Sequence, residues 1–412
     1  MSIFALIALL LTVTALLSWV NERYLRMPHT IGVMTAALIL SVALIVLGHF
    51  GLVVDQWAED LFGRIDFSTV LMKGMLSFLL FAGALHVDLS ALLQRKWTIL
   101  SLATVGVLIS TFLVAGFFYF LASAFGFPVP FLWALLFGAL ISPTDPIAVL
   151  GILKSAHAPE SLESRIVGES LFNDGVGVVI FTLLLGFVTE RKEFSWIGVG
   201  ELFIEEAVGG VVVGLVLGYI AYRLLKSVDN YTVEVLITLA LVSGGYVLAG
   251  ALHTSGPIAM VVAGLFIGNH GRVFGMSDRT RRHLDTFWEL VDEILNALLF
   301  VMIGLELLVL DVEPIYLLIG ALCIPLVLVA RSISVGMPVT LLRRFRPIER
   351  FTVRLLTWAG VRGGISIALA LAIPPSPHRD LLLVATYVIV IFSIFVQGLS
   401  IGRLIRWTAA RT

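Results

Sequence analysis

Apolar residues occur in this chain in long stretches that short polar connections separate. Ile3–Val20, Ile31–Leu47 and Leu381–Val396 are three such stretches. A helix needs roughly 17–25 predominantly apolar residues to cross the hydrocarbon core of a bilayer, and each stretch has that length or nearly so. The pattern therefore predicts an all-α polytopic membrane protein, with residues 1–412 forming one transmembrane unit.

The same length criterion predicts about thirteen membrane-spanning helices along the chain. Their approximate bounds are 2–20, 30–48, 67–87, 97–122, 130–154, 164–188, 199–225, 231–252, 255–269, 283–309, 314–341, 351–373 and 380–406. No basic residue precedes Ile3, so we expect a retained first helix rather than a cleaved signal peptide. We expect no cytoplasmic regulatory tail after the last span.

The composition agrees with a membrane protein. Hydrophobic residues make up 59% of the chain and charged residues 13%, whereas about 25% of the residues in a soluble domain are charged. The net charge of −1 gives no reason to expect a nucleic-acid partner. One cysteine, Cys323, cannot form an internal disulfide or a multi-cysteine metal site. No motif predicts a cofactor.

The distribution of basic residues predicts the orientation. If the N-terminus lies outside, twenty of the 27 Lys and Arg residues fall on the inner side and four on the outer side. One miscounted span would invert every later connection and remove this bias. We therefore expect a multi-pass cell-membrane protein with its N-terminus outside and its C-terminus in the cytoplasm. The sequence contains no G-x-x-x-x-G-K-[ST] motif, so an ion gradient is the predicted energy source.

Two predicted helices contain residues that interrupt helical hydrogen bonding. Pro143 and Pro146 flank Thr144-Asp145 in the fifth, and three glycines surround Arg362 in the twelfth. These helices run in opposite directions, so spans 1–6 and 8–13 are predicted to form two inverted six-helix repeats with broken helices 5 and 12. Such pairs mark the midplane site of transporters, although simple kinks at Pro and Gly are also common in membrane helices.

The sixth span carries the densest group of polar residues, in Gly168–Gly177 (GESLFNDGVG). Glu169 and Asn173 are four residues apart. Ser170 and Asp174 have the same spacing, so both pairs lie on adjoining strips of one helix face. Their hard oxygen atoms suit Na⁺ or Li⁺. Desolvation favours a neutral carboxyl group, so Asp174 can hold a proton or a cation but not both, which couples the two flows.

Structural ion pairs are the alternative interpretation of these carboxylates. A charge at the bilayer centre costs at least roughly 2.5–3.5 kcal/mol on insertion scales, so it needs a partner or a function. We expect Arg362 to pair with Glu169, and Arg331 to pair with Asp145. Span ten has a further polar face that is either a funnel wall leading to the site or a solvated helix end; its residues are Glu289, Asp292 (or Glu293) and Asn296.

Four motifs indicate a family. They are Ser142–Ala148 (SPTDPIA), Gly168–Gly177, Phe300–Glu306 (FVMIGLE) and Val361–Ile365 (VRGGI). In this order they resemble the monovalent cation:proton antiporter family, closest to its NhaP-type Na⁺/H⁺ exchangers, and the resemblance covers nearly the whole chain. It implies a homodimer in membrane lipid. Each protomer would contain a moving core of spans 4–6 and 11–13 (about 97–188 and 314–406) and a scaffold (about 1–90 and 199–309).

The resemblance also implies the residues of the site. One aspartate binds Na⁺ or a proton beside an asparagine, and three further residues assist; in this sequence they are Asp174, Asn173, Ser170, Thr144 and Asp145. The asparagine–aspartate pair, where other branches have two aspartates, is similar to the electroneutral branch. We therefore predict that one cation is exchanged per proton.

Two further implications concern charges. Glu169 and Arg362 match the family's structural ion pair. Family members often carry an acidic residue on the third span, where this chain reads Phe81–Leu85 (FAGAL). Without that carboxylate, ion affinity or the preference between Na⁺ and K⁺ can differ from that of close relatives.

Other functions stay open at the level of sequence. A K⁺/H⁺ antiporter of the same fold would use the same residues. An intramembrane hydrolase would use paired aspartates such as Asp145 and Asp174, but neither H-E-x-x-H nor G-x-S-x-G occurs. A passive channel is the third alternative, although a titratable carboxylate in broken inverted repeats favours stoichiometric exchange. The prediction is therefore a secondary active transporter and not an enzyme.

Overall fold

The computed structural model describes residues 3–49, 70–145, 153, 160–190, 196–308, 310, 312–345, 348 and 351–409. Within these ranges the chain forms helices and no strand, which confirms the all-α prediction. The helices up to residue 251 are α1 (Ile3–Val20), α2 (His29–His49), α5 (Leu76–Leu85), α6 (Leu89–Gln94), α7 (Lys96–Ser101), α8 (Val107–Ala124), α9 (Phe131–Ile141), α11 (Glu160–Glu190), α12 (Trp196–Lys226) and α13 (Tyr231–Ala251).

The remaining helices follow after short turns. They are α14 (Gly256–Phe266), α15 (Arg272–Phe274), α16 (Asp278–Glu306), α17 (Pro314–Leu342), α18 (Thr352–Ala359), α19 (Gly364–Leu371), α20 (Arg379–Phe392) and α21 (Leu399–Ala409). Five π-helical turns join or extend them: η1 (Asn21–Leu25), η2 (Val70–Met75), η3 (Leu102–Gly106), η4 (Ile267–Gly271) and η5 (Ser393–Gly398).

Among the described residues, nine helices are long and apolar enough to cross a membrane, and α18 with α19 form a tenth as one bent span. α5 and α9 are shorter apolar helices of 10 and 11 residues. A polytopic membrane protein is thus confirmed, whereas thirteen spans and inverted repeats remain predictions. Residues 146–152 and 154 of the predicted fifth span lie outside the described residues, as does Pro146. So do seven of the basic residues that set the predicted orientation: Arg64, Lys154, Arg191, Lys192, Arg346, Arg350 and Arg411.

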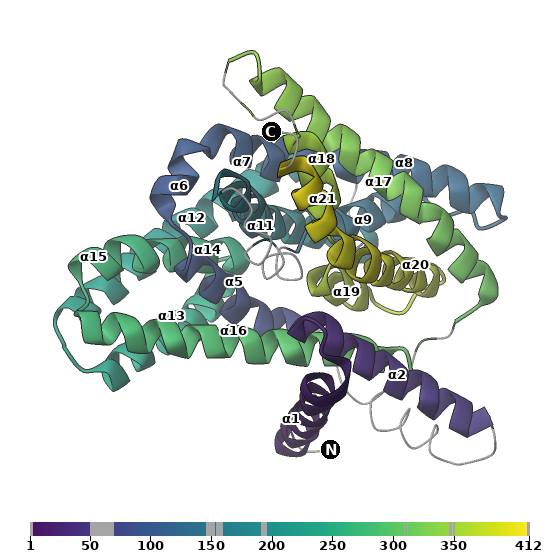
Figure 1. The fold of residues 1–412 in the computed structure, drawn as a ribbon. Helices are drawn as coiled ribbons and strands as arrows, with labels where there is room; N and C mark the ends of the chain where they lie inside the picture. Colours follow the sequence, from purple (N-terminus) through teal and green to yellow (C-terminus); the bar gives the residue numbers. More distant parts are fainter. Residues whose placement is uncertain are drawn as a thin grey trace.

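α11 lies in the interior of the helix assembly (Figure 1). The most apolar stretch of α11 is 72% buried inside the protein, against 22% for that of the span that begins with α1. α11 packs against α9 and α7 and also against α14 and α12. The helix that carries the predicted cation-binding residues is therefore enclosed by other helices instead of facing lipid.

The helix contacts form two neighbourhoods. In the first, α5, α12, α13 and α14 pack together, and α16 packs against α2 and α5. In the second, α17 packs against α8, α18 and α20, while α9 packs against α8 and α11. Cys323 belongs to α17 and is 2% exposed. α11 of the predicted core also packs against α12 and α14 of the predicted scaffold, and the division into two bundles remains a prediction.

The segment Phe81–Leu85, which lacks the family's frequent carboxylate, lies in an apolar interior. The ring centroids of Phe81 and Trp288 are 4.7 Å apart, and Ala82 is fully buried. Small residues bring α14 against α5, because a Cβ at Gly264 would lie 2.7 Å from the Phe81 carbonyl oxygen. At this position α5 and α14 are closely packed.

Candidate functional site

The first break in helical structure follows α9. The helix ends at Ile141, and Pro143–Asp145 are not helical. Pro143 has no amide hydrogen to donate and disfavours helix at the residue before it. The hydroxyl of Ser142 closes the helix end by donating to the Gly138 carbonyl at 2.7 Å. The predicted opening of this helix is present in the structure.

The second break separates α18 from α19, whose axes differ by 47°. Gly360–Gly363 between them are not helical. Two of these glycines are needed because other groups lie where a side chain would be. A Cβ at Gly363 would collide with the carboxylate of Asp145, and one at Gly360 would lie 2.5 Å from the Nε of Arg331.

The two non-helical segments contact each other directly. The Asp145 amide donates to the Val361 carbonyl at 2.8 Å. In the other direction, Nη1 of Arg362 donates to the carbonyl of Pro143 at 2.8 Å and also to that of Ser142. These bonds satisfy backbone groups that have lost their helical partners, which a membrane interior requires.

α11 presents its predicted face to the first of these segments. The Thr144 amide donates to Oδ1 of Asn173 at 3.2 Å, and Nδ2 of Asn173 donates to the Thr144 hydroxyl at 2.8 Å. The hydroxyls of Thr144 and Ser170 are 3.1 Å apart. The structure thus brings together three of the residues predicted for the site, with the asparagine amide orienting the threonine.

Asp174 lies beside this group. It is 6% exposed, and its Oδ1 has no hydrogen-bond partner among the described residues. Its charge interacts with those of Asp145 and Arg362. A buried carboxylate oxygen without a donor costs free energy as an anion, so the group is stabilised by taking up either a proton or a cation.

The ion pairs differ from the predicted ones. Nη1 of Arg331 lies 2.5 Å from Oε1 of Glu169, and both side chains are buried. Nη2 of Arg331 donates to the Leu356 carbonyl at 3.2 Å. The predicted pairing of Glu169 with Arg362 is therefore corrected to Arg331, and within the described part of the chain Arg331 forms its ion pair with Glu169 and not with Asp145. The physical reason is that Nη1 of Arg362 donates to the Ser142 and Pro143 carbonyls of the opened fifth helix, whereas Nη1 of Arg331 reaches Glu169.

Two polar residues that the sequence argument passed over hold the second segment in place. The hydroxyl of Ser393 accepts from the Arg362 amide at 2.8 Å and donates to Oε1 of Gln397 at 2.7 Å. Nε2 of Gln397 donates to the Trp358 carbonyl at 3.1 Å. The sequence held a signal for them, because Ser393 and Gln397 are four positions apart and therefore lie on one face of the last predicted span.

The polar face of span ten reaches towards the site from α16. Glu289 and Glu293 are exposed, whereas Asn296 is buried and donates to the Asp292 carbonyl at 2.8 Å. The carboxylate of Asp292 interacts electrostatically with His86 and Asp145. The acidic face of α16 therefore carries exposed carboxylates at Glu289 and Glu293 and one at Asp292 whose charge interacts with that of Asp145.

Two crossed non-helical segments beside a buried carboxylate, within a polytopic helical assembly, are typical of secondary transporters. This chain belongs to the sodium/hydrogen exchanger family, because the model of the transmembrane "Sodium/hydrogen exchanger" family matches residues 8–407.

Individual relatives agree with the family. The chain is 53% identical over 406 residues to the Na⁺/H⁺ antiporter NhaP of Pseudomonas aeruginosa, covering 97% of this chain and 96% of that protein. It is 36% identical over 368 residues to the Na⁺/H⁺ antiporter NhaH of Halobacillus dabanensis, covering 88% and 89%. Its fold is similar to that of the sodium proton antiporter MjNhaP1 from Methanocaldococcus jannaschii, with a TM-score of 0.76 at 19% identity, covering 98% and 97%.

The corrected pairing predicts the outcome of a double-mutant cycle. Removing one member of a buried ion pair costs about 3–5 kcal/mol because the other charge is left without its partner. Glu169→Gln and Arg331→Gln should each lower the free energy of unfolding in detergent by that order, and the double variant by much less than their sum. The same cycle with Arg362→Gln should show weaker coupling to Glu169→Gln. Stronger coupling to Arg362 would restore the original pairing.

Proposed function

We propose that this protein exchanges a monovalent cation, Na⁺ or Li⁺, for protons across the cell membrane, with both ions competing for Asp174. The observation that carries the proposal is the buried Asp174 carboxylate, whose Oδ1 has no hydrogen-bond donor among the described residues beside the crossed segments. The names of the relatives, Na⁺/H⁺ antiporters from two bacterial genera, support Na⁺ as the cation.

The surrounding oxygen atoms suit a small hard cation. The carboxylate of Asp145 packs against Gly363, and the hydroxyls of Thr144 and Ser170 lie within hydrogen-bond distance of each other. With Asp174 they form the proposed ligand set for Na⁺. Asn173 is a positioning residue in this proposal, because both ends of its amide are bonded to Thr144.

Charge counting supports one cation per proton. The five ionisable side chains at the crossing are three acids and two arginines: Asp145, Glu169, Asp174, Arg331 and Arg362. Fully ionised, they leave one negative charge, which either one Na⁺ or one proton neutralises. Both loaded forms of the site then carry the same charge, so the proposed exchange is electroneutral.

Alternating access completes the proposal. A core bundle (about 97–188 and 314–406) carries the site past a scaffold bundle (about 1–90 and 199–309), through which two protomers associate as a homodimer. The N-terminus lies outside and the C-terminus in the cytoplasm.

A K⁺/H⁺ exchanger of the same architecture remains the second candidate, since Phe81–Leu85 carries no carboxylate to assist ion selection. A hydrolase that uses Asp145 and Asp174 is the alternative of a different class.

The first test uses purified protein in liposomes with an acidic lumen. Adding Na⁺ or Li⁺ outside should raise the luminal pH, and Asp174→Asn should abolish the response because the amide cannot exchange a proton. Asp380→Asn is the matched control, since its side chain is 53% exposed at the start of α20. A response to K⁺ but not to Na⁺ would favour the second candidate. No cation-dependent proton movement in the wild type would refute the antiporter.

Competition for one carboxylate predicts a particular pH dependence. Protons occupy the site as the pH falls, so the half-saturating Na⁺ concentration should rise by about tenfold per pH unit once the site is mostly protonated. The maximal rate at saturating Na⁺ should change far less. The measurement is the initial rate across a series of Na⁺ concentrations, with the same pH inside and outside the vesicles, repeated at several pH values. A constant half-saturation with a falling maximal rate would indicate separate sites.

Electroneutral exchange predicts insensitivity to voltage. A membrane potential imposed with a permeant-anion gradient should leave the initial rate of Na⁺-driven luminal alkalinisation unchanged, and turnover should generate no potential of its own. A voltage-sensitive dye and a pH dye in the same vesicles report both quantities. A rate that follows the imposed potential would exclude one cation per proton.

A further inference from the structure

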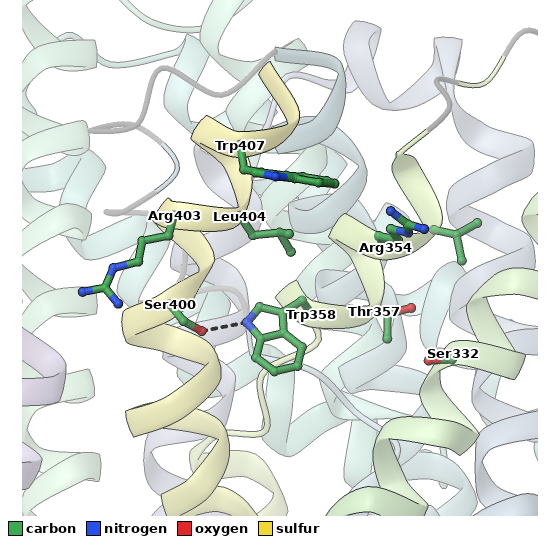
Figure 2. Close-up of a pocket in the computed structure, with 9 residues that line it drawn as sticks. Ser332, Arg354, Thr357, Trp358, Ser400, Arg403, Leu404 and Trp407 are labelled. Atoms are coloured by element: carbon green, nitrogen blue, oxygen red, sulfur yellow. Dashed lines mark hydrogen bonds between the residues drawn. The ribbon is translucent and has the colours of Figure 1, made fainter. Parts of the chain in front are cut away.

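A groove of about 670 Å³ opens on the surface of the protein between α17, α18 and α21. Figure 2 shows Arg354 and Arg403 on opposite sides of the groove, with the indoles of Trp358 and Trp407 between them and the Arg403 guanidinium directed away from the indoles. Arg354, Arg403 and Trp407 are exposed. The ion site described above uses none of these four residues as a ligand.

The groove lies at a membrane surface. The short connections of the chain put the end of α17, the start of α18 and the end of α21 on the same side of the bilayer. Trp358 is in the second turn of α18, roughly 9 Å below its start at a rise of 1.5 Å per residue. Tryptophan and arginine at this depth meet lipid headgroups and the first carbons of the acyl chains.

The charged residues that line the groove are all basic. Two arginines contribute to the groove, and Arg344 contributes to a second cavity of about 460 Å³ farther along α17. Among the described residues that line the two cavities, none is acidic. Apolar side chains complete both walls, among them Leu404 in the groove and Met337, which is 64% exposed, in the neighbouring cavity.

We propose that this groove binds an anionic phospholipid. Its phosphate lies between the edges formed by Arg354 and Arg403, and its acyl chains lie along Leu404 and Met337. Basic pockets between membrane helices bind anionic headgroups in this way. A zwitterionic lipid fits less well, because its ammonium group would bring a positive charge to the arginines.

The groove wall is joined to the broken helix by hydrogen bonds. The indole of Trp358 donates to the Ser400 hydroxyl at 2.8 Å, shown in Figure 2. Gln397 donates to the Trp358 carbonyl and accepts from Ser393, which receives the Arg362 amide. A lipid that holds α18 against α21 therefore stabilises the native packing around the second break, and its binding raises the unfolding temperature by mass action.

The experiment measures lipid binding by native mass spectrometry and thermal unfolding in detergent. It compares phosphatidylglycerol with phosphatidylcholine. Wild type should bind phosphatidylglycerol at least about fivefold more tightly and unfold at a higher temperature with it. Arg354→Gln/Arg403→Gln should lose that preference and the lipid-induced shift. Arg406→Gln is the matched control, because it removes the same charge from the same end of α21 without lining the groove.

The outcomes separate this proposal from its alternatives. Comparing the shift with and without lipid, rather than absolute melting temperatures, removes any general loss of stability in the double variant. A second variant, Arg354→Lys/Arg403→Lys, keeps the charge and should keep most of the preference. The proposed lipid site would be overturned if wild type bound the two lipids equally. It would also be overturned if the double variant and Arg406→Gln lost the lipid preference to the same extent. Neither readout depends on ion exchange, so the proposed function can fail while the lipid site stands.

Discussion

The crossing of two non-helical segments inside the membrane is the constraint on which the rest of the structure depends. Each opened backbone group there costs several kcal/mol unless it finds a partner, because no lipid group can replace water. Pro143 and Val361 supply carbonyls, and the Arg362 guanidinium and Asp145 amide supply donors. The proposed cation site lies at this crossing, where hydroxyls and carboxylates gather beside the interrupted helices.

Features that depend on local chemistry could be predicted from the sequence. Contacts that depend on how deep a residue lies in the bundle, and on the rotation of its helix, could not. Proline and glycine located both breaks, and the spacing of Ser170, Asn173 and Asp174 placed them on one face. The sequence did not predict that Glu169 pairs with Arg331. Arg331 and Arg362 each stand alone in an apolar span, so only their final positions decide which one reaches the carboxylate and which one reaches Pro143.

Glycines mark the places where the two neighbourhoods of helices meet. A Cβ at Gly175 of α11 would lie 3.0 Å from Ile258 of α14, and one at Gly364 of α19 would collide with Leu299 of α16. At both positions the side chain of the facing helix occupies the space that a Cβ would need. Small residues of this kind allow membrane helices to approach closely.

The position of Cys323 has a practical consequence for measuring the proposed movement of one bundle past the other. The one thiol of the chain, on α17, is buried in an apolar cluster with residues of other helices and is 2% exposed, so reagents that modify accessible cysteines find little to react with in the native fold. The natural protein is thus already a nearly silent background for labelling. One cysteine introduced at a time along α16 or beside the groove would report solvent access from each side of the bilayer without first replacing the native residue.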